Sequence, residues 1–227
     1  MKIAPLSSAW RLSRFAVYDA QSGVRVKKYR DHYFKKAKQE NYPARSVYKL
    51  QEIDKKFKLL RPGIKVVDLG ASPGSWSLYA AERVGPGGRV LAADLNPANA
   101  QFPPQVTFLQ ADVFEPGEAF AAALAAMGPV HVVLSDMAPK TTGVKFTDQA
   151  RSLGLAEQAL ALARQCLIQD GNMVIKVFMG PDVKAFVESM QGLFRVVKNV
   201  KPQSSRSESK ETFLVGLGFR PEPDGSS

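Results

Sequence analysis

The chain has 227 residues, of which 45% are hydrophobic and 23% charged, a composition typical of a globular domain with a sizeable core. Its net charge is +10, and residues 1–65 carry 17 Lys and Arg against 5 Asp and Glu, a net charge of +12. This uneven excess favours a polyanion such as nucleic acid as partner, with a merely solvated basic surface as the alternative. One cysteine and two histidines are too few for a disulfide or for a metal site built on them, and no apolar run is long enough to span a membrane.

Residues 1–30 are predicted to form a basic extension without clear periodicity. In the segment YRDHYFKKAKQENY, which follows, Tyr29, Tyr33, Phe34 and Tyr42 alternate with cations. Such aromatic side chains can stack on RNA bases, or they can be the buried face of an amphipathic helix, and the sequence leaves both alternatives open. The apolar spacing over 44–57 then predicts a helix that ends before the Arg-Pro-Gly at 61–63.

From residue 64 onward, short apolar strands alternate with helices. The strands are expected at 64–70, 89–95, 106–112, 129–139, 172–179, 194–202 and 211–219. The helices are expected at 75–84, 116–127, 146–169 and 181–193, with Gly171 at the end of the third. This alternation predicts an α/β domain over 31–220, with a mainly parallel sheet covered by helices on both faces. The last two strands have no helix between them and are expected to pair antiparallel or to enclose the serine-rich loop, and residues 221–227 to be a disordered tail.

Acidic residues follow several of the predicted strands, and a glycine-rich turn, DLGASPGSW, follows the first. In open α/β sheets ligands bind beyond the carboxyl ends of the strands, so these residues are expected to face one crevice. The residues concerned are Asp68, Gly70, Asp94, Asp112 and Asp136. The backbone at Gly70 and Gly74 would allow close approach of a ligand. Asp94, after the second strand, is placed to bind a ribose diol, and Asp112, after the third, to bind a base edge, so the pattern favours adenosine. The alternative is that these acids only cap helices, which explains Asp112 poorly because no helix follows it at once.

Four charged residues stand in distinct sequence frames: Lys49 in RSVYKL, Asp136 in LSDMAPK, Lys176 in VIKVF and Glu211 in SKETFLV. Charges in or beside buried strands are costly unless they are paired. Brought together at one sheet edge, the two lysines and two acids would pair and perturb one another's protonation, which is typical of a site that handles protons. The alternative is two surface ion pairs.

These frames, together with PQSSRSESKE and the glycine turn, resemble in spacing and order the FtsJ/RrmJ family of ribosomal RNA 2′-O-methyltransferases over residues 30–219. The resemblance implies a Rossmann-like methyltransferase fold with a seven-stranded sheet, S-adenosylmethionine as cofactor, and a Lys-Asp-Lys-Glu catalytic set at Lys49, Asp136, Lys176 and Glu211. It assigns cofactor contacts to Gly74, Trp76, Asp94, Asp112 and Asp136, although Trp76 could instead anchor a helix in the core. Ser75 departs from the family pattern, because relatives often have a second glycine there.

A ribose hydroxyl needs alignment and a proton acceptor before it can attack a sulfonium methyl group. We therefore expect Lys176 to be the base, with Asp136 and Lys49 positioning it and Glu211 supporting them. The resemblance implies a uridine of large-subunit ribosomal RNA as substrate. We expect the basic N-terminal region, residues 1–65, to bind the RNA phosphates. We also expect a monomer, because no exposed apolar stripe stands out in the sequence, and a cytoplasmic location. Alternatives are a transfer RNA substrate or a non-catalytic ribosome-assembly factor. A nicotinamide-dependent oxidoreductase is disfavoured, because the chain lacks G-x-G-x-x-G.

Overall fold

The computed structural model describes residues 32–206 and 209–221, so the predicted extension at 1–30 and most of the predicted tail lie outside the described residues. Six helices are described: α1 His32–Gln39, α2 Val47–Phe57, α3 Ser75–Val84, α4 Gly117–Met127, α5 Lys145–Cys166 and α6 Val183–Leu193. Seven strands are described: β1 Lys65–Leu69, β2 Arg89–Asp94, β3 Val106–Gln110, β4 Val130–Ser135, β5 Leu167–Phe178, β6 Phe194–Val200 and β7 Glu211–Phe219. Among these residues, no helix combines the length and the apolar character needed to cross a bilayer.

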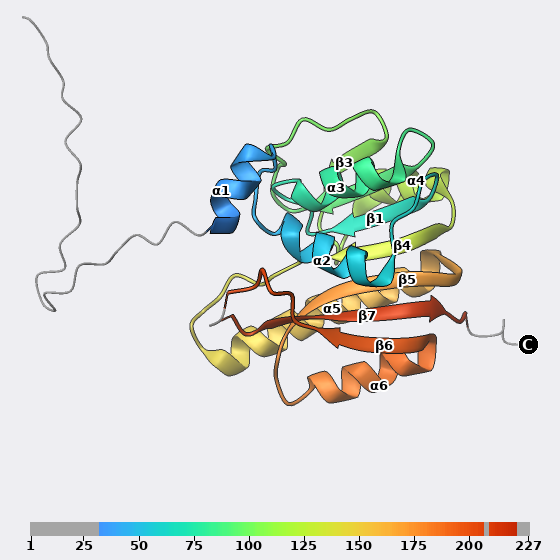
Figure 1. Cartoon of the computed structure of the whole chain (residues 1–227). Coiled ribbons are helices and arrows are strands. Elements are labelled where there is room, and N and C mark those ends of the chain that lie inside the picture. The colour runs from blue at the N-terminus through green and yellow to red at the C-terminus, as the bar shows by residue number, and fades with distance from the viewer. Residues whose placement is uncertain (1–31, 207–208, 222–227) are drawn as a thin grey trace, which may run out of the picture. The chain divides into compact units, whose positions relative to one another are not determined.

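The strands form one sheet in the order β3-β2-β1-β4-β5-β7-β6 (Figure 1). The first five strands run parallel, because a helix returns the chain between successive strands in most of this half. β7 pairs antiparallel with both β5 and β6 and lies between them. The predicted mainly parallel sheet with antiparallel last strands is therefore confirmed.

Alternate side chains of the central strands feed two separate cores, one on each face of the sheet. On one face, Val66 and Val90 pack with residues of α2 and α3, including Trp76. On the other face, Val67 and Leu91 pack with residues of α4, α5 and α6. Figure 1 shows α2 and α3 in front of the sheet and α5 behind it. Both faces of the parallel strands are thus covered, which leaves the strand ends as the accessible edge.

The third long helix ends earlier than predicted, and Gly171 lies inside β5 rather than at a helix terminus. The pairing of β4 with β5 explains the difference: Val130 pairs with Leu167 but Val132 pairs with Asn172, so β5 contains a bulge. Asp170 in this bulge has a φ of 64°, and a Cβ on Gly171 would lie 2.9 Å from the carbonyl oxygen of Ile168. The glycine therefore serves the bulge and not a helix cap.

The aromatic residues near the start of the described chain pack mainly on the protein itself. The ring centroids of Tyr33 and Tyr48 are 5.3 Å apart, and both tyrosines belong to a small core with Ala37. The Tyr42 hydroxyl donates a hydrogen bond to Glu82. The alternative of an amphipathic helix packed on the body therefore holds for Tyr33 on α1, while Tyr42 packs on the body from the segment after that helix. Phe34 is 53% exposed, and Tyr29 lies outside the described residues.

Candidate active site

The four charged residues predicted to act together come from α2 and from three neighbouring strands. Asp136 directly follows β4, Lys176 lies near the end of β5, and Glu211 begins β7. In the β5–β7 pairing, Lys176 is opposite Phe213 and Phe178 is opposite Glu211. Because side chains two residues apart share a face of a strand, Lys176 and Glu211 project from the same face as diagonal neighbours. The antiparallel insertion of β7 thus delivers an acid to the carboxyl edge of the parallel strands.

Two ion pairs form at this edge. The Lys176 Nζ lies 2.9 Å from Asp136 Oδ1, and it donates its hydrogen bond to the main-chain carbonyl of Asp136. Asp136 Oδ1 has no hydrogen bond of good geometry, so its contact with the lysine is ionic rather than directional. The Lys49 Nζ pairs with Glu211 Oε1 and lies 5.8 Å from the centroid of the Phe213 ring.

The electrostatics around Glu211 favour its charged form in spite of burial. The four side chains are between 7% and 15% exposed. Burial acts to raise the pKa of Glu211, but the hydrogen bond and charge of Lys49, with smaller contributions from Lys176 and Ser205, outweigh it and lower that pKa below its usual value. Glu211 is therefore ionised at neutral pH and holds Lys49 in place.

The glycine turn after β1 brings the chain close to the residue that follows Asp136. Gly70 has a φ of 74°, and a Cβ at this position would lie 2.7 Å from the main-chain nitrogen of Met137. Only glycine fits this contact without displacement of the backbone. Gly74 has a φ of 116°, and a Cβ there would lie 2.6 Å from the Cβ of Ala100. Both predicted glycines are thus required by conformation, although Gly74 faces the 97–102 loop.

A cavity of about 350 Å³, here termed the strand-end cavity, opens beside this turn. Its lining includes Gly70, Asp94, Asp112 and Met137, together with Leu95 and Phe114 at its rim. The Asp94 carboxylate accepts a hydrogen bond of 3.0 Å from the Ser72 amide, and Asp112 accepts one of 2.9 Å from the Phe114 amide. Asp94 Oδ1 also accepts two bonds from Asn96, so the acceptor position left on Asp94 is on Oδ2. Asp112 has acceptor positions left as well, so both acids can still hold a polar ligand.

Four residues expected at the crevice do not line the strand-end cavity. Gly74 faces the 97–102 loop and Asp136 pairs with Lys176, whereas Asp68 and Trp76 are buried. Asp68 is fully buried beneath the turn, where the Ser77 hydroxyl donates to it, so it does not line the strand-end cavity. Trp76 is 2% exposed, donates through Nε1 to the carbonyl of Ser46 at 2.9 Å and packs on Phe213. The Trp76 side chain therefore anchors α3 to α2, as the core alternative predicted.

Two further cavities differ in their relation to the charged set. A larger one of about 510 Å³ lies at the amino ends of β1 and β2, beside Lys65 and Arg89, and is remote from the four residues. A smaller one of about 270 Å³ is lined by Arg45, Lys49, Arg206 and Glu211 and is here termed the α2–β7 pocket. Since it contains the Lys49–Glu211 pair and two arginines, we take it and the strand-end cavity as the two halves of the site.

The sequence did not indicate the apolar rim of the strand-end cavity or the role of the β6–β7 connection. Leu95 and Phe114 are 62% and 51% exposed, unusual for large apolar side chains, and each follows closely on a strand-end acid. Their position next to Asp94 and Asp112 is the sequence feature from which this apolar rim could have been predicted. The Ser205 hydroxyl lies 3.4 Å from Glu211 Oε1, a contact that no spacing rule predicts.

Comparison with known proteins shows which family this chain resembles. The family model described as FtsJ-like methyltransferase matches residues 42–219. A protein of Nitratidesulfovibrio vulgaris named ribosomal RNA large subunit methyltransferase E is 67% identical over 195 residues, which cover 86% of this chain and 97% of that protein. A protein of the same name from Oleidesulfovibrio alaskensis is 63% identical over 201 residues, covering 88% and 97%. The crystal structure of a ribosomal RNA methyltransferase from Plasmodium falciparum superposes with a TM-score of 0.70, with 24% identity, over 80% of this chain and 100% of that one, which supports the fold alone.

Proposed function

Because this chain belongs to the FtsJ-like methyltransferase family, we propose that it transfers a methyl group from S-adenosylmethionine to a ribose 2′-hydroxyl of large-subunit ribosomal RNA, at a uridine. The names of its relatives support the substrate. The observation that carries the chemistry is the pairing of Lys176 with Asp136 beside the pair of Lys49 with Glu211. Surface ion pairs would not be buried together at the carboxyl edge of a parallel sheet.

The strand-end cavity fits the methyl donor by the chemistry of its lining. Asp94 and Asp112 offer acceptors to hydroxyl and amine groups, while Leu95 and Phe114 offer apolar surface to a flat base. Gly70 lines the cavity and allows the turn to pack closely on Met137 beside it. When bound, S-adenosylmethionine supplies an electrophilic methyl group, which bonds to the ribose oxygen as its bond to sulfur breaks.

Lys176 is the proposed general base that receives the 2′-hydroxyl proton. A neutral amine has two N–H donors and one lone pair. The main-chain carbonyl of Asp136 accepts a hydrogen bond from one of these donors, which orients the amine so that its lone pair can face the hydroxyl. Lys49, held by Glu211, supplies a positive charge that helps position the ribose beside the base.

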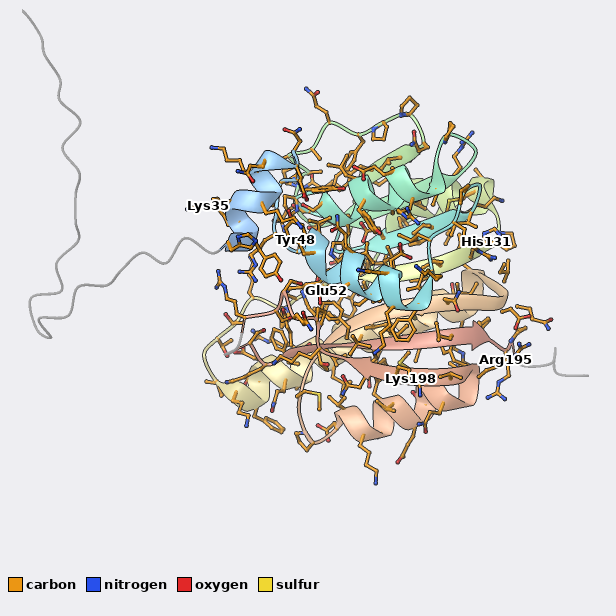
Figure 2. The ribbon with its side chains drawn as sticks, viewed as in Figure 1. Lys35, Tyr48, Glu52, His131, Arg195 and Lys198 are labelled. Carbon is orange, nitrogen blue, oxygen red and sulfur yellow. The ribbon has the colours of Figure 1, made fainter. Side chains whose placement is uncertain are left out.

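Cations beside the site are suited to the RNA backbone. Lys35 and Lys38 are exposed on α1, and Lys35 lies on its outer side (Figure 2). Arg45 and Arg206 line the α2–β7 pocket together with Lys49. These side chains can meet phosphates around the target ribose, so binding should weaken as salt rises. The four charged residues come from one chain, which supports a monomer, and a ribosomal substrate supports a cytoplasmic location.

The proposal is tested by methylation of large ribosomal subunits from cells that lack such an enzyme, in parallel with bulk transfer RNA. Purified protein and radiolabelled S-adenosylmethionine are added, and the labelled ribose is mapped. We expect label in the large-subunit RNA, loss of label with Lys176→Ala, and unchanged label with Lys184→Ala, an exposed lysine on α6. Label in transfer RNA would change the substrate but keep the chemistry. No label despite measurable binding of S-adenosylmethionine would favour the assembly-factor alternative.

A further inference from the structure

The carboxylate of Glu52, on α2, binds main-chain amides of the connection between β6 and β7. Glu52 Oε2 accepts a hydrogen bond of 2.6 Å from the amide of Gln203, and Oε1 accepts one of 2.9 Å from the amide of Ser204. The Arg45 guanidinium donates to the carbonyl of Ser204. Two consecutive amides that point the same way attract an anion, and a carboxylate accepts such bonds more strongly than a neutral group. Side chains at and beside α2 thus fix the connection at Gln203 and Ser204.

This connection borders the α2–β7 pocket. Directly after Ser204, the Ser205 hydroxyl contacts Glu211, and Arg206 lines the pocket. Lys49 and Glu52 are three residues apart on α2 and therefore share one side of the helix. Figure 2 shows Glu52 on α2, in line with Tyr48 one turn away. Helix α2 therefore positions Lys49 directly and, through Glu52, the connection that borders the α2–β7 pocket.

We propose that Glu52 is a positioning residue for RNA binding: its carboxylate holds residues 203–206 in place so that Ser205 and Arg206 face the bound ribose and its phosphate. This inference rests on the proposed function. Glu52 contacts none of the four charged residues through any interaction found in the described chain, so it acts only through the connection. Without the Glu52 carboxylate, residues 203–206 must become ordered when RNA binds. The entropy cost of that ordering weakens RNA binding.

The test compares wild type with Glu52→Ala and Glu52→Gln, and with Glu157→Ala, an exposed glutamate on α5, as matched control. Gln keeps the length and one acceptor oxygen but presents an N–H₂ group to an amide donor, so we expect an intermediate effect. For Glu52→Ala we expect the KM for large-subunit RNA to rise about tenfold, with kcat and the affinity for S-adenosylmethionine nearly unchanged. Glu157→Ala should match wild type.

Hydrogen–deuterium exchange supplies a readout that is independent of activity. Amide exchange in peptides that contain Gln203 and Ser204 should accelerate in Glu52→Ala, while exchange in β5 and β7 stays as in wild type. An unchanged KM, or a fall in kcat accompanied by faster exchange throughout the sheet, would overturn the inference. If the wild-type chain methylated no RNA, the proposed function would fail, and the role of Glu52 in RNA binding with it. Accelerated local exchange would then mark only a structural contact.

Discussion

Replacement of Asp68 by Asn is expected to stabilise the protein above pH 7 and not at pH 5. Asp68 is fully buried at the end of β1, and its Oδ1 has no hydrogen-bond partner within the described residues. Burial, reinforced by the charges of Asp136 and Asp94 and opposed by the Ser77 hydroxyl, raises the pKa of Asp68 from 3.8 to about 7. The folded state therefore binds this proton more tightly than the unfolded state, and stability falls as pH rises between these values.

The size of the effect follows from that shift. An increase in pKa from 3.8 to about 7 corresponds to a destabilisation of roughly 4 kcal/mol above pH 7. Asn removes the charge and can still accept from Ser77, but its buried N–H₂ group lacks a partner, at a cost of about 1–3 kcal/mol. The net expectation is a gain of about 1–3 kcal/mol at pH 8 that disappears at pH 5, where the wild-type carboxyl is mostly protonated.

Urea unfolding at pH 5 and pH 8, without S-adenosylmethionine, measures this difference. Asp182→Asn, at an exposed position before α6, serves as control and should show no such pH dependence. If Asp68→Asn lowered the free energy of unfolding equally at both pH values, Asp68 would be an ordinary ionised carboxylate, and the reasoning from burial would be refuted.

Three further outcomes are expected. Gly70→Ala should destabilise by about 1–3 kcal/mol more than Gly63→Ala, measured by urea unfolding, because both positions have positive φ but only Gly70 would place its Cβ against Met137. Trp76→Phe should cost about 1 kcal/mol through loss of its bond to Ser46, yet calorimetry should find the affinity for S-adenosylmethionine unchanged, since a fall would return Trp76 to the cofactor site. Finally, the KM for RNA should rise steeply between 50 and 200 mM salt, roughly as counterion release requires, and a flat response would argue against phosphate contacts by the basic segment.

The sheet and the three members of the charged set at strand ends could be predicted because each depends on local pattern. Strand–helix alternation determines a parallel sheet, and residues at the ends of parallel strands must meet at one edge. Asp94 and Asp112 were found in this way. Lys49 could be included only through the family resemblance, because nothing in the periodicity of α2 indicates which strand it faces.

The incorrect and missing predictions have a common physical cause. The same local sequence pattern can have different structural roles, and tertiary packing determines which role a residue takes. Asp68 stands at a strand end like Asp94, but it lies beneath the turn and not beside it. Gly171 resembles a helix terminator, whereas the shift in pairing between β4 and β5 uses it in a bulge. The bonds from Gln203 and Ser204 to Glu52 join residues about 150 positions apart, and main-chain donors leave no trace in the sequence.

The place of β7 has a consequence for the order in which the domain can mature. β7 follows every other described strand in the chain, yet it lies inside the sheet, between β5 and β6, and it carries Glu211. A nascent chain that has emerged from the ribosome only as far as β6 therefore has neither a complete sheet nor a partner for Lys49. The charged set is completed in the same step that completes the sheet, so under the proposed function we expect partly synthesised chains to be inactive.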